Sequence, residues 1–166
     1  MRPLYPFIAA GLCLFLSLPA LANDTVFPAN SLIGLKPPGA MKAHVGLSMF
    51  EDEAEDAVIS LFAEPNTGAH EQPFSEFGKI DKVPPDKTLE GPVQYWKLAE
   101  GIEAYLLVYT VNKGGKVQRH WTMAAQDADL LAILFARAPA DSKVYSDALM
   151  QAALRTLQFR KAPPEE

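Results

Sequence analysis

The sequence predicts an α+β fold in which an antiparallel β-sheet of about six strands has helices packed on both faces. Three observations lead to this class. Segment 93–138 indicates successive strands joined by short turns, the pattern of an antiparallel meander. Its strongest strand, 102–111, is apolar on both sides, as expected of a central strand covered on both faces. The clearest helix signal, at 141–155, follows the meander.

The N-terminal part of the chain supplies further strands. A short apolar strand is predicted at 31–36, where the pair Pro37-Pro38 ends it because proline lacks a backbone donor. Segments 47–51 and 57–64 are predicted to form two more strands. Between them lies the acidic turn, Glu51–Asp56, whose polar side chains favour a solvated connection.

The stretch before the meander shows weaker signals. A short helix is predicted over 74–80 because Phe74, Phe77 and Ile80 fall on one side at helical spacing. The polar, proline-bearing segment 81–92 indicates a loop. This part of the chain therefore contributes one helix and a long connection.

The meander is divided by turn residues. Strand 93–98 leads through a turn at 100–101 into strand 102–111. The pair Gly114-Gly115 marks a hairpin because glycine adopts positive φ without strain, and strand 116–125 returns. These turns predict that neighbouring strands in the sequence also pair in the sheet.

The last part of the chain contains a strand, a helix and a final strand. Segment 129–138 suits a helix as well as a strand by composition, but the flanking turn signals leave about ten residues, which favours a strand. The helix over 141–155 is predicted to begin at Asp141 or Ser142, both good capping residues. Segment 156–160 is predicted to form a final strand.

The first residues, 1–22, have the features of a cleaved secretory signal peptide. Arg2 precedes an apolar run over 7–18, and Ala20-Leu21-Ala22 gives the small-x-small cleavage pattern. An uncleaved membrane anchor is the alternative, which the prolines in the run disfavour. Cleavage would remove Cys13, the one cysteine of the chain, and leave an exported, disulfide-free protein. The periplasm is the expected compartment, with extracellular release as the other.

The remaining chain is predicted to be a single globular domain over 23–161 with a short tail, 162–166. The net charge is −5 before Arg2 is removed, and no basic block occurs, so nucleic acid is not an expected partner. No apolar run of membrane-spanning length follows the signal peptide, so stable membrane insertion is not expected.

Few residues carry a recognisable chemistry. The three histidines, His44, His70 and His120, lack metal-ligand spacing, and no nucleophile elbow, phosphate-binding loop or dinucleotide motif occurs. No catalytic residue, metal ligand or cofactor is predicted, and the protein is not expected to be an enzyme. The acidic turn could hold a divalent cation weakly, although it lacks the order and the glycine of an EF-hand loop.

Aromatic residues concentrate in the meander, where most are expected to fill the core. Trp96 and Trp121 are the two whose position the sequence leaves open. If both are exposed, they form a patch for a partner or a ligand. They are the predicted site residues.

Two stretches follow a recognisable arrangement. The first is SLIGLKPPGAM (31–41) with LSMFED (47–52) and AVISLF (57–62), and the second is LLAILFARAPADSKVYSDALMQAALRTLQFR (130–160). They resemble small secreted proteins of the PsbP/Mog1-like fold, in particular the bacterial DcrB-type envelope proteins. The resemblance covers about two-thirds of the chain after the signal peptide. It implies an antiparallel sheet between helices, an α/β/α sandwich.

The resemblance also bears on function. The family consists of accessory and binding proteins, so it implies no catalytic motif to transfer. Segment 65–87 is short for the helical insert common in the group. The expected function is a non-catalytic binding or assembly factor of the cell envelope whose partner is another envelope protein. The alternative is a small-ligand or divalent-cation-binding protein, or an unrecognised hydrolase, with a cleft on one sheet face.

Overall fold

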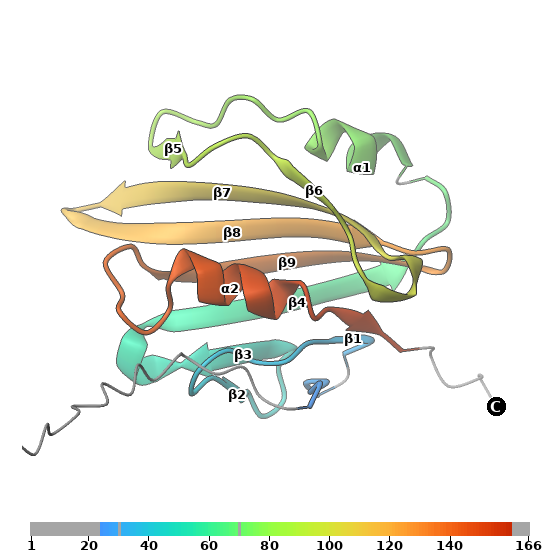
Figure 1. Ribbon diagram of the computed structural model, residues 1–166, viewed down its shortest axis with the longest axis horizontal. Coiled ribbons are helices and arrows are strands. Elements are labelled where there is room, and N and C mark those ends of the chain that lie inside the picture. The colour runs from blue at the N-terminus through green and yellow to red at the C-terminus, as the bar shows by residue number, and fades with distance from the viewer. Residues whose placement is uncertain (1–23, 30, 70, 161–166) are drawn as a thin grey trace, which may run out of the picture.

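The computed structural model describes residues 24–29, 31–69 and 71–160 (Figure 1). Its largest unit is an antiparallel sheet of eight strands in the order β2-β3-β4-β9-β8-β7-β5, with β6 also paired to β7. A separate two-stranded sheet joins β1 to β10. The predicted signal peptide, 1–22, and the predicted tail, 162–166, lie outside the described residues.

The strands of the large sheet vary from two to eleven residues: β2 (Lys42–Ala43), β3 (Met49–Asp52), β4 (Ala57–Pro65), β5 (Lys87–Leu89), β6 (Gln94–Lys97), β7 (Glu103–Lys113), β8 (Lys116–Gln126) and β9 (Leu130–Pro139). The other elements are short: β1 (Ile33–Gly34), β10 (Gln158–Phe159), the 3-10 turns η1 (Glu53–Glu55) and η2 (Ala99–Gly101), and the helices α1 (Glu71–Phe77) and α2 (Asp147–Leu154).

The predicted meander is confirmed. Strands β7 and β8 pair along their whole length, from Glu103 opposite Gln126 to Lys113 opposite Lys116, and β9 continues on the far edge of β8. Segment 129–138 is a strand, as its flanking turns predict, and it also pairs with β4 on its other edge. The sheet therefore grows from the meander outwards to the earlier strands.

One side of the sheet, the closed face, packs against α2. Side chains that alternate along the strands form a single buried cluster with Leu149, Met150 and Leu154 of α2. The helix begins at Ser146, whose Oγ accepts from the backbone N–H of Leu149 at 3.3 Å. The sheet residues of the closed face are Ile59, Leu61, Ala104, Leu106, Val108, Trp121, Met123, Leu134 and Ala136.

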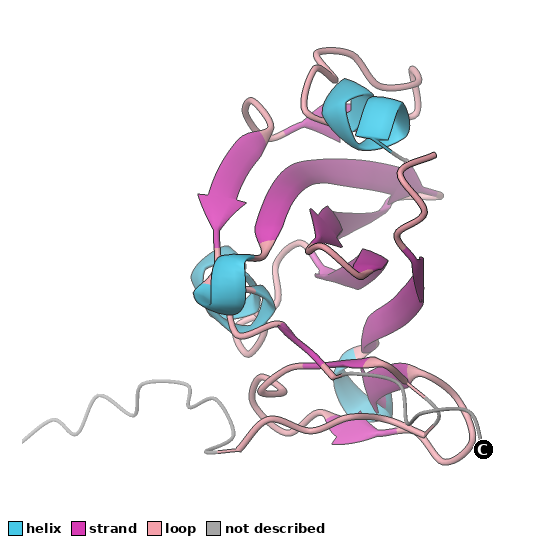
Figure 2. Ribbon diagram, turned by 90° about the vertical axis from the view of Figure 1, so that its right-hand side faces the viewer, coloured by secondary structure: helices cyan, strands magenta, loops and turns pink. Residues whose placement is uncertain are grey.

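The opposite side, the open face, is covered over part of its width. Phe74 of α1 packs with Ala124 and Leu131, and the connection after α1 covers Leu107 and Tyr109 of β7. The two helices lie on different sides of the curved sheet in Figure 2. The strand apolar on both sides is therefore covered on both sides, as the sequence predicts. The open face consists of Val58, Ser60, Phe62, Leu107, Tyr109, His120, Thr122, Ala124, Ile133, Phe135 and Arg137.

The prediction of about six strands is wrong, because the main sheet contains eight. Strand β2 has two residues and β5 has three, and β5 lies in the segment predicted as a loop. Segments this short show no alternation of apolar and polar residues, so they give no strand signal. They form because β3 and β7 offer free edges to pair with.

The predicted helices differ in their bounds. The helix predicted over 141–155 begins at Asp147, and the one predicted over 74–80 occupies Glu71–Phe77. The structure is mostly antiparallel sheet with two short α-helices among the described residues, so helix contributes less than an α/β/α sandwich implies. Neither helix has the length and apolar character needed to cross a bilayer.

Candidate functional site

Trp96 and Trp121 do not form an exposed patch. Trp96 is 5% exposed and Trp121 is 1% exposed. The Trp121 Nε1 donates to Asp147 Oδ1 at 2.7 Å, and the Arg155 guanidinium lies 3.7 Å from the centre of the Trp96 ring. Both partners come from the C-terminal helix or its last turn. The two rings therefore hold α2 on the closed face.

The acidic turn forms the end of β3 and the 3-10 turn η1. Its carboxylates accept hydrogen bonds from the protein: Tyr145 Oη donates to Asp52 Oδ2 at 2.7 Å, and Arg137 Nη1 donates to Asp56 Oδ1 at 2.9 Å. Gln118 Nε2 donates to the second oxygen of Asp56 at 3.1 Å. A cation bound at these oxygens would have to displace those donors.

The two described histidines, His44 and His120, lie on different segments of the chain. His44 Nε2 is 3.5 Å from Glu51 Oε1, His120 lies in β8, and His70 is outside the described residues. Within the described part of the chain, no three His, Cys, Asp or Glu side chains gather as metal ligands would. The structure thus gives no geometric basis for a metal centre in that part.

His120 belongs to a stack on the open face. Its ring lies 5.2 Å from that of Tyr109 at an interplanar angle of 13°, and Lys87 Nζ lies 4.9 Å from the centre of the Tyr109 ring. Burial lowers the pKa of His120, and the charges of Arg137, Lys113 and Lys87 lower it further. The imidazole Nε2 is buried and hydrogen-bonded to no described residue. The arrangement favours a neutral, stacked imidazole.

The uncovered part of the open face carries an exposed aromatic pair. Phe62 of β4 is 58% exposed and Phe135 of β9 is 47% exposed. Their rings meet edge to face, with centroids 5.9 Å apart at 72°. Phe62 lies opposite Ile133 and Phe135 lies opposite Ser60, so the two rings are diagonal neighbours across the strand pair. We call these two residues the aromatic pair.

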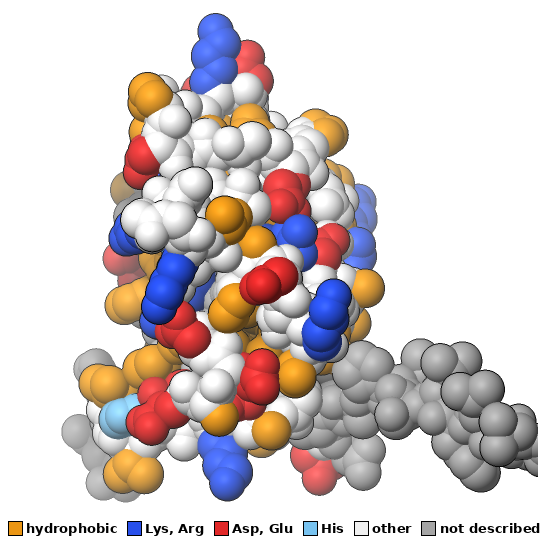
Figure 3. Space-filling view, turned by 90° about the vertical axis from the view of Figure 1, so that its left-hand side faces the viewer, with side chains coloured by type: hydrophobic (Ala, Val, Ile, Leu, Met, Phe, Trp, Pro, Cys, Tyr) orange, Lys and Arg blue, Asp and Glu red, His pale blue; other side chains and the backbone are white. Residues whose placement is uncertain are grey.

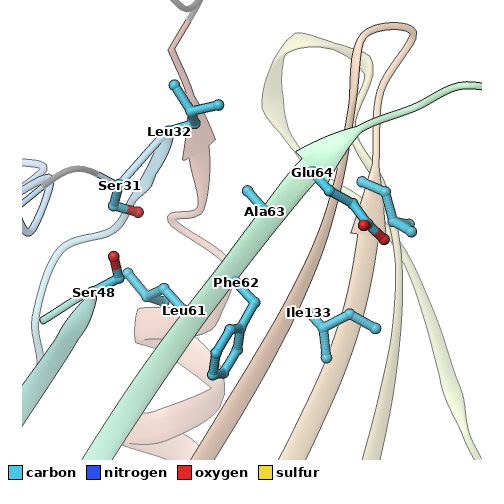
Figure 4. A pocket seen from close by; sticks show the side chains of 9 residues that line it. Ser31, Leu32, Ser48, Leu61, Phe62, Ala63, Glu64 and Ile133 are labelled. Atoms are coloured by element: carbon cyan, nitrogen blue, oxygen red, sulfur yellow. The ribbon is translucent and has the colours of Figure 1, made fainter.

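A hollow of about 470 Å³ adjoins the aromatic pair. In Figure 4, Leu61 and Ala63 face segment 31–32 across the hollow, whereas Phe62 projects from the other side of β4. The hollow therefore follows the edge of β4 and reaches both faces of the strand. Its lining consists of Ser31, Leu32, Ser48, Leu61, Phe62, Ala63, Glu64, Leu131 and Ile133.

Three polar side chains line the hollow: those of Ser31, Ser48 and Glu64. Ser31 Oγ donates to the carbonyl of Ile33 at 2.7 Å, and Ser48 Oγ donates to the carbonyl of Ala29 at 3.2 Å. Both hydroxyl protons are therefore already used within the chain. The lining therefore has no side-chain donor left for a small polar ligand, whereas an apolar chain would find Phe62 and Ile133.

The end of the molecule that contains the β7–β8 hairpin and the acidic turn has a different surface. Acidic and basic side chains lie side by side over this end (Figure 3). No field of a single sign forms there, so this end gives no sign of a partner recruited by charge. The aromatic pair and the hollow are thus the surface features with the clearest capacity to bind.

Sequence reasoning did not single out the aromatic pair or the hollow. The sequence contains part of the information, because AVISLF and LLAILF place apolar residues on both sides of each strand. The covering of one side by α1 stops before β4, and nothing in the local sequence marks where it stops. The exposure of Phe62 and Phe135 follows from that tertiary arrangement.

The comparisons with known proteins give little. No protein-family model matches the chain, and no curated protein matches it. Among solved structures, a similar chain is LpqN of Mycobacterium tuberculosis, described as involved in cell envelope biogenesis, with 17% identity, a TM-score of 0.48 and coverage of 84% of this chain and 86% of that one. A likeness at this level carries no argument about function. Membership in the PsbP/Mog1-like family is not shown and stays a prediction.

Proposed function

We propose that this chain is an exported, non-catalytic protein of the cell envelope that binds another protein through the open face of its sheet. The observation that carries the proposal is the exposed aromatic pair, Phe62 and Phe135. Aromatic residues are enriched in protein interfaces, and exposed apolar patches mark interaction sites. The signal-peptide pattern over 1–22 supports the compartment.

The arrangement of the open face supports a protein partner over a small ligand. The pair lies on a sheet surface beside the partly buried Ile133, and the hollow next to it is open along a strand edge. Ligand sites combine an apolar lining with a few convergent polar groups. The hydroxyls of Ser31 and Ser48 already donate within the chain, and the third polar residue of the lining, Glu64, is a carboxylate, so no side-chain donor is left to a small ligand.

A photo-crosslinking amino acid placed at Phe135 in the native host tests the binding surface. Val117, which is 43% exposed near the β7–β8 hairpin, takes the same amino acid as the matched control. We expect one exported protein to be linked from position 135 and not from position 117. Absence of any product at 135, or the same products at both positions, would contradict the proposal.

The compartment has its own test. N-terminal sequencing of the protein recovered from the envelope fraction should give Asn23 as the first residue. Recovery of an uncleaved chain, or of a chain confined to the cytosol, would contradict export.

A further inference from the structure

One edge of β4 has no strand partner among the described residues over its last part. Strand β3 begins at Met49, which lies opposite Ser60, and one residue earlier the Ser48 carbonyl accepts from the Leu61 N–H at 2.8 Å. Strand β4 continues beyond this bond to Pro65. No described strand pairs with that edge of β4 beyond Leu61.

The direction of the free backbone groups follows from the ladder. In antiparallel sheets, consecutive residues direct their N–H and C=O to alternate neighbours. Leu61 bonds towards the β3 side, and the Asn66 N–H bonds to Asp129 on the β9 side at 2.8 Å. Odd-numbered residues of β4 therefore face the β3 side. The N–H and C=O of Ala63 point into the hollow.

We propose that the hollow receives an extended segment of a partner protein as an added β-strand that hydrogen-bonds to Ala63. Strand addition of this kind uses main-chain bonds for affinity and alternate side chains for specificity. The inference deepens the proposed function, on which it rests, because it names the form in which the partner is bound. The neighbouring Phe62 is then covered by the same segment.

The shape of the hollow selects a single extended chain. Segment 31–32 stands opposite the edge of β4, and Ser48, bonded to Leu61, closes one end of the hollow, so the entering element has a wall on its other side. A second copy cannot offer its own β4 edge, because the same wall flanks that edge in the second copy. A tail or an extended loop of another protein fits this space without a sheet behind it.

The positions of the lining side chains define which residues the segment would carry. A residue opposite Ala63 points to the side that Ala63 shares with Leu61 and Ser31, where a small side chain fits. The next residue points to the open face, where Phe62 and Ile133 favour an aliphatic or aromatic side chain. Pro65 has no N–H, so the paired stretch is about four residues, or roughly 13 Å of strand.

The test uses a phage-displayed library of linear twelve-residue peptides, selected against the protein purified after export from its host. Ala63→Pro removes the N–H that points into the hollow and leaves the bonds to β9 in place. Lys97→Pro is the matched control, because the Lys97 N–H points outwards from β6 at the opposite edge of the sheet. We expect enriched peptides in which a small residue has apolar neighbours.

Peptide binding should weaken by about two- to tenfold in Ala63→Pro and stay unchanged in Lys97→Pro, since a lost hydrogen bond of ordinary strength has an effect of this order. If Ala63→Pro does not fold, Ala63→Phe is the second variant. Its side chain fills the hollow and leaves the N–H intact, so peptide binding should again weaken. Slower exchange of the Ala63 amide proton on binding supplies a direct measurement.

Three results would overturn the inference: no enriched peptide, peptides that bind the Ala63 variants as well as the unaltered protein, or an Ala63 amide that exchanges equally fast with peptide bound. These outcomes differ from failure of the proposed function. If crosslinking from Phe135 captures a partner whose binding survives the Ala63 variants, the function stands and the added strand does not.

Discussion

The closed and open faces are built by the same strands and are covered in different ways. Leu134 and Phe135 are neighbours in β9, yet Leu134 is 0% exposed under α2 and Phe135 is 47% exposed on the other side. The closed face meets a helix that contributes three large buried side chains. The open face meets a cover that ends before β4. The closed face is therefore expected to contribute more to stability, and the open face is the one through which we propose binding.

Truncating these two neighbours gives the largest contrast. Leu134→Ala should lower the free energy of unfolding by about 3 kcal/mol, because it removes fully buried methyl groups and leaves a cavity. Phe135→Ala should lower it by less than about 1 kcal/mol, because the ring is half-exposed. Urea unfolding of both variants checks the pair. Equal losses would show that the open face is covered in solution.

Two tyrosine hydroxyls extend the comparison. Tyr145 is buried, and its hydroxyl donates to Asp52; burial, followed by that bond, raises its pKa above the usual value for a tyrosine. Tyr145→Phe should lower the free energy of unfolding by about 1–3 kcal/mol, because it leaves the carboxylate without its donor. Tyr95 also donates to a carboxylate, that of Glu103, but it is exposed.

Tyr95→Phe is therefore the matched control and should not change the unfolding midpoint measurably. Chemical denaturation of both variants at neutral pH makes the comparison. A larger loss in Tyr95→Phe than in Tyr145→Phe would contradict the assignment of stability to the closed face.

The third prediction concerns pH. The pKa of His120 is lowered in the folded protein by burial and then by the charges of Arg137 and two lysines, so the unfolded chain binds the proton more readily. Stability should therefore fall as the pH drops below about 6.5 and through the folded-state pKa, and then level off. His120→Phe should flatten this decline while it keeps a ring against Tyr109. Thermal unfolding across pH 5 to 7.5 measures it.

The control for that experiment is His44→Gln. This variant leaves His120 in place, so the loss of stability at low pH that is due to His120 should remain. If the decline is unchanged in His120→Phe, titration of His120 does not contribute to it.

The smallest effect is expected for calcium at the acidic turn. Asp52 and Asp56 already accept hydrogen bonds from Tyr145, Arg137 and Gln118, so little is gained by exchanging these donors for a weakly held cation. Thermal unfolding with and without millimolar calcium should give the same midpoint. A clear upward shift would show that the turn binds calcium.

The meander could be predicted from sequence because its signals are local. The apolar run over 102–111 and the Gly114-Gly115 turn specify β7 and its return in β8 without reference to the rest of the chain. The start of α2 shows where such signals compete. Ser142 caps a turn, accepting from the N–H groups of Val144 and Tyr145, and the helix begins four residues later at the cap formed by Ser146. Two good caps in succession made the earlier one misleading.

The site could not be predicted because it depends on tertiary placement. Trp121 is buried by α2. Phe62 is exposed because the residues of α1 that cover the open face reach β8 and β9 but not β4. The hollow exists because β3 begins only at Met49, opposite Ser60, while β4 continues to Pro65. Each of these three features depends on residues distant in the sequence, so local sequence patterns could not predict it.

The pairing of β1 with β10 has a consequence for the order of folding. Ile33 lies opposite Phe159, and the Lys36 N–H donates to Thr156 Oγ1, a bond between residues 120 positions apart. Closing so long a loop is entropically costly and slows folding, so local hairpins such as β7–β8 should form first. During synthesis, β10, which gives β1 its partner, emerges after all the other described strands and helices. Until then the chain has its central strands but not its complete core.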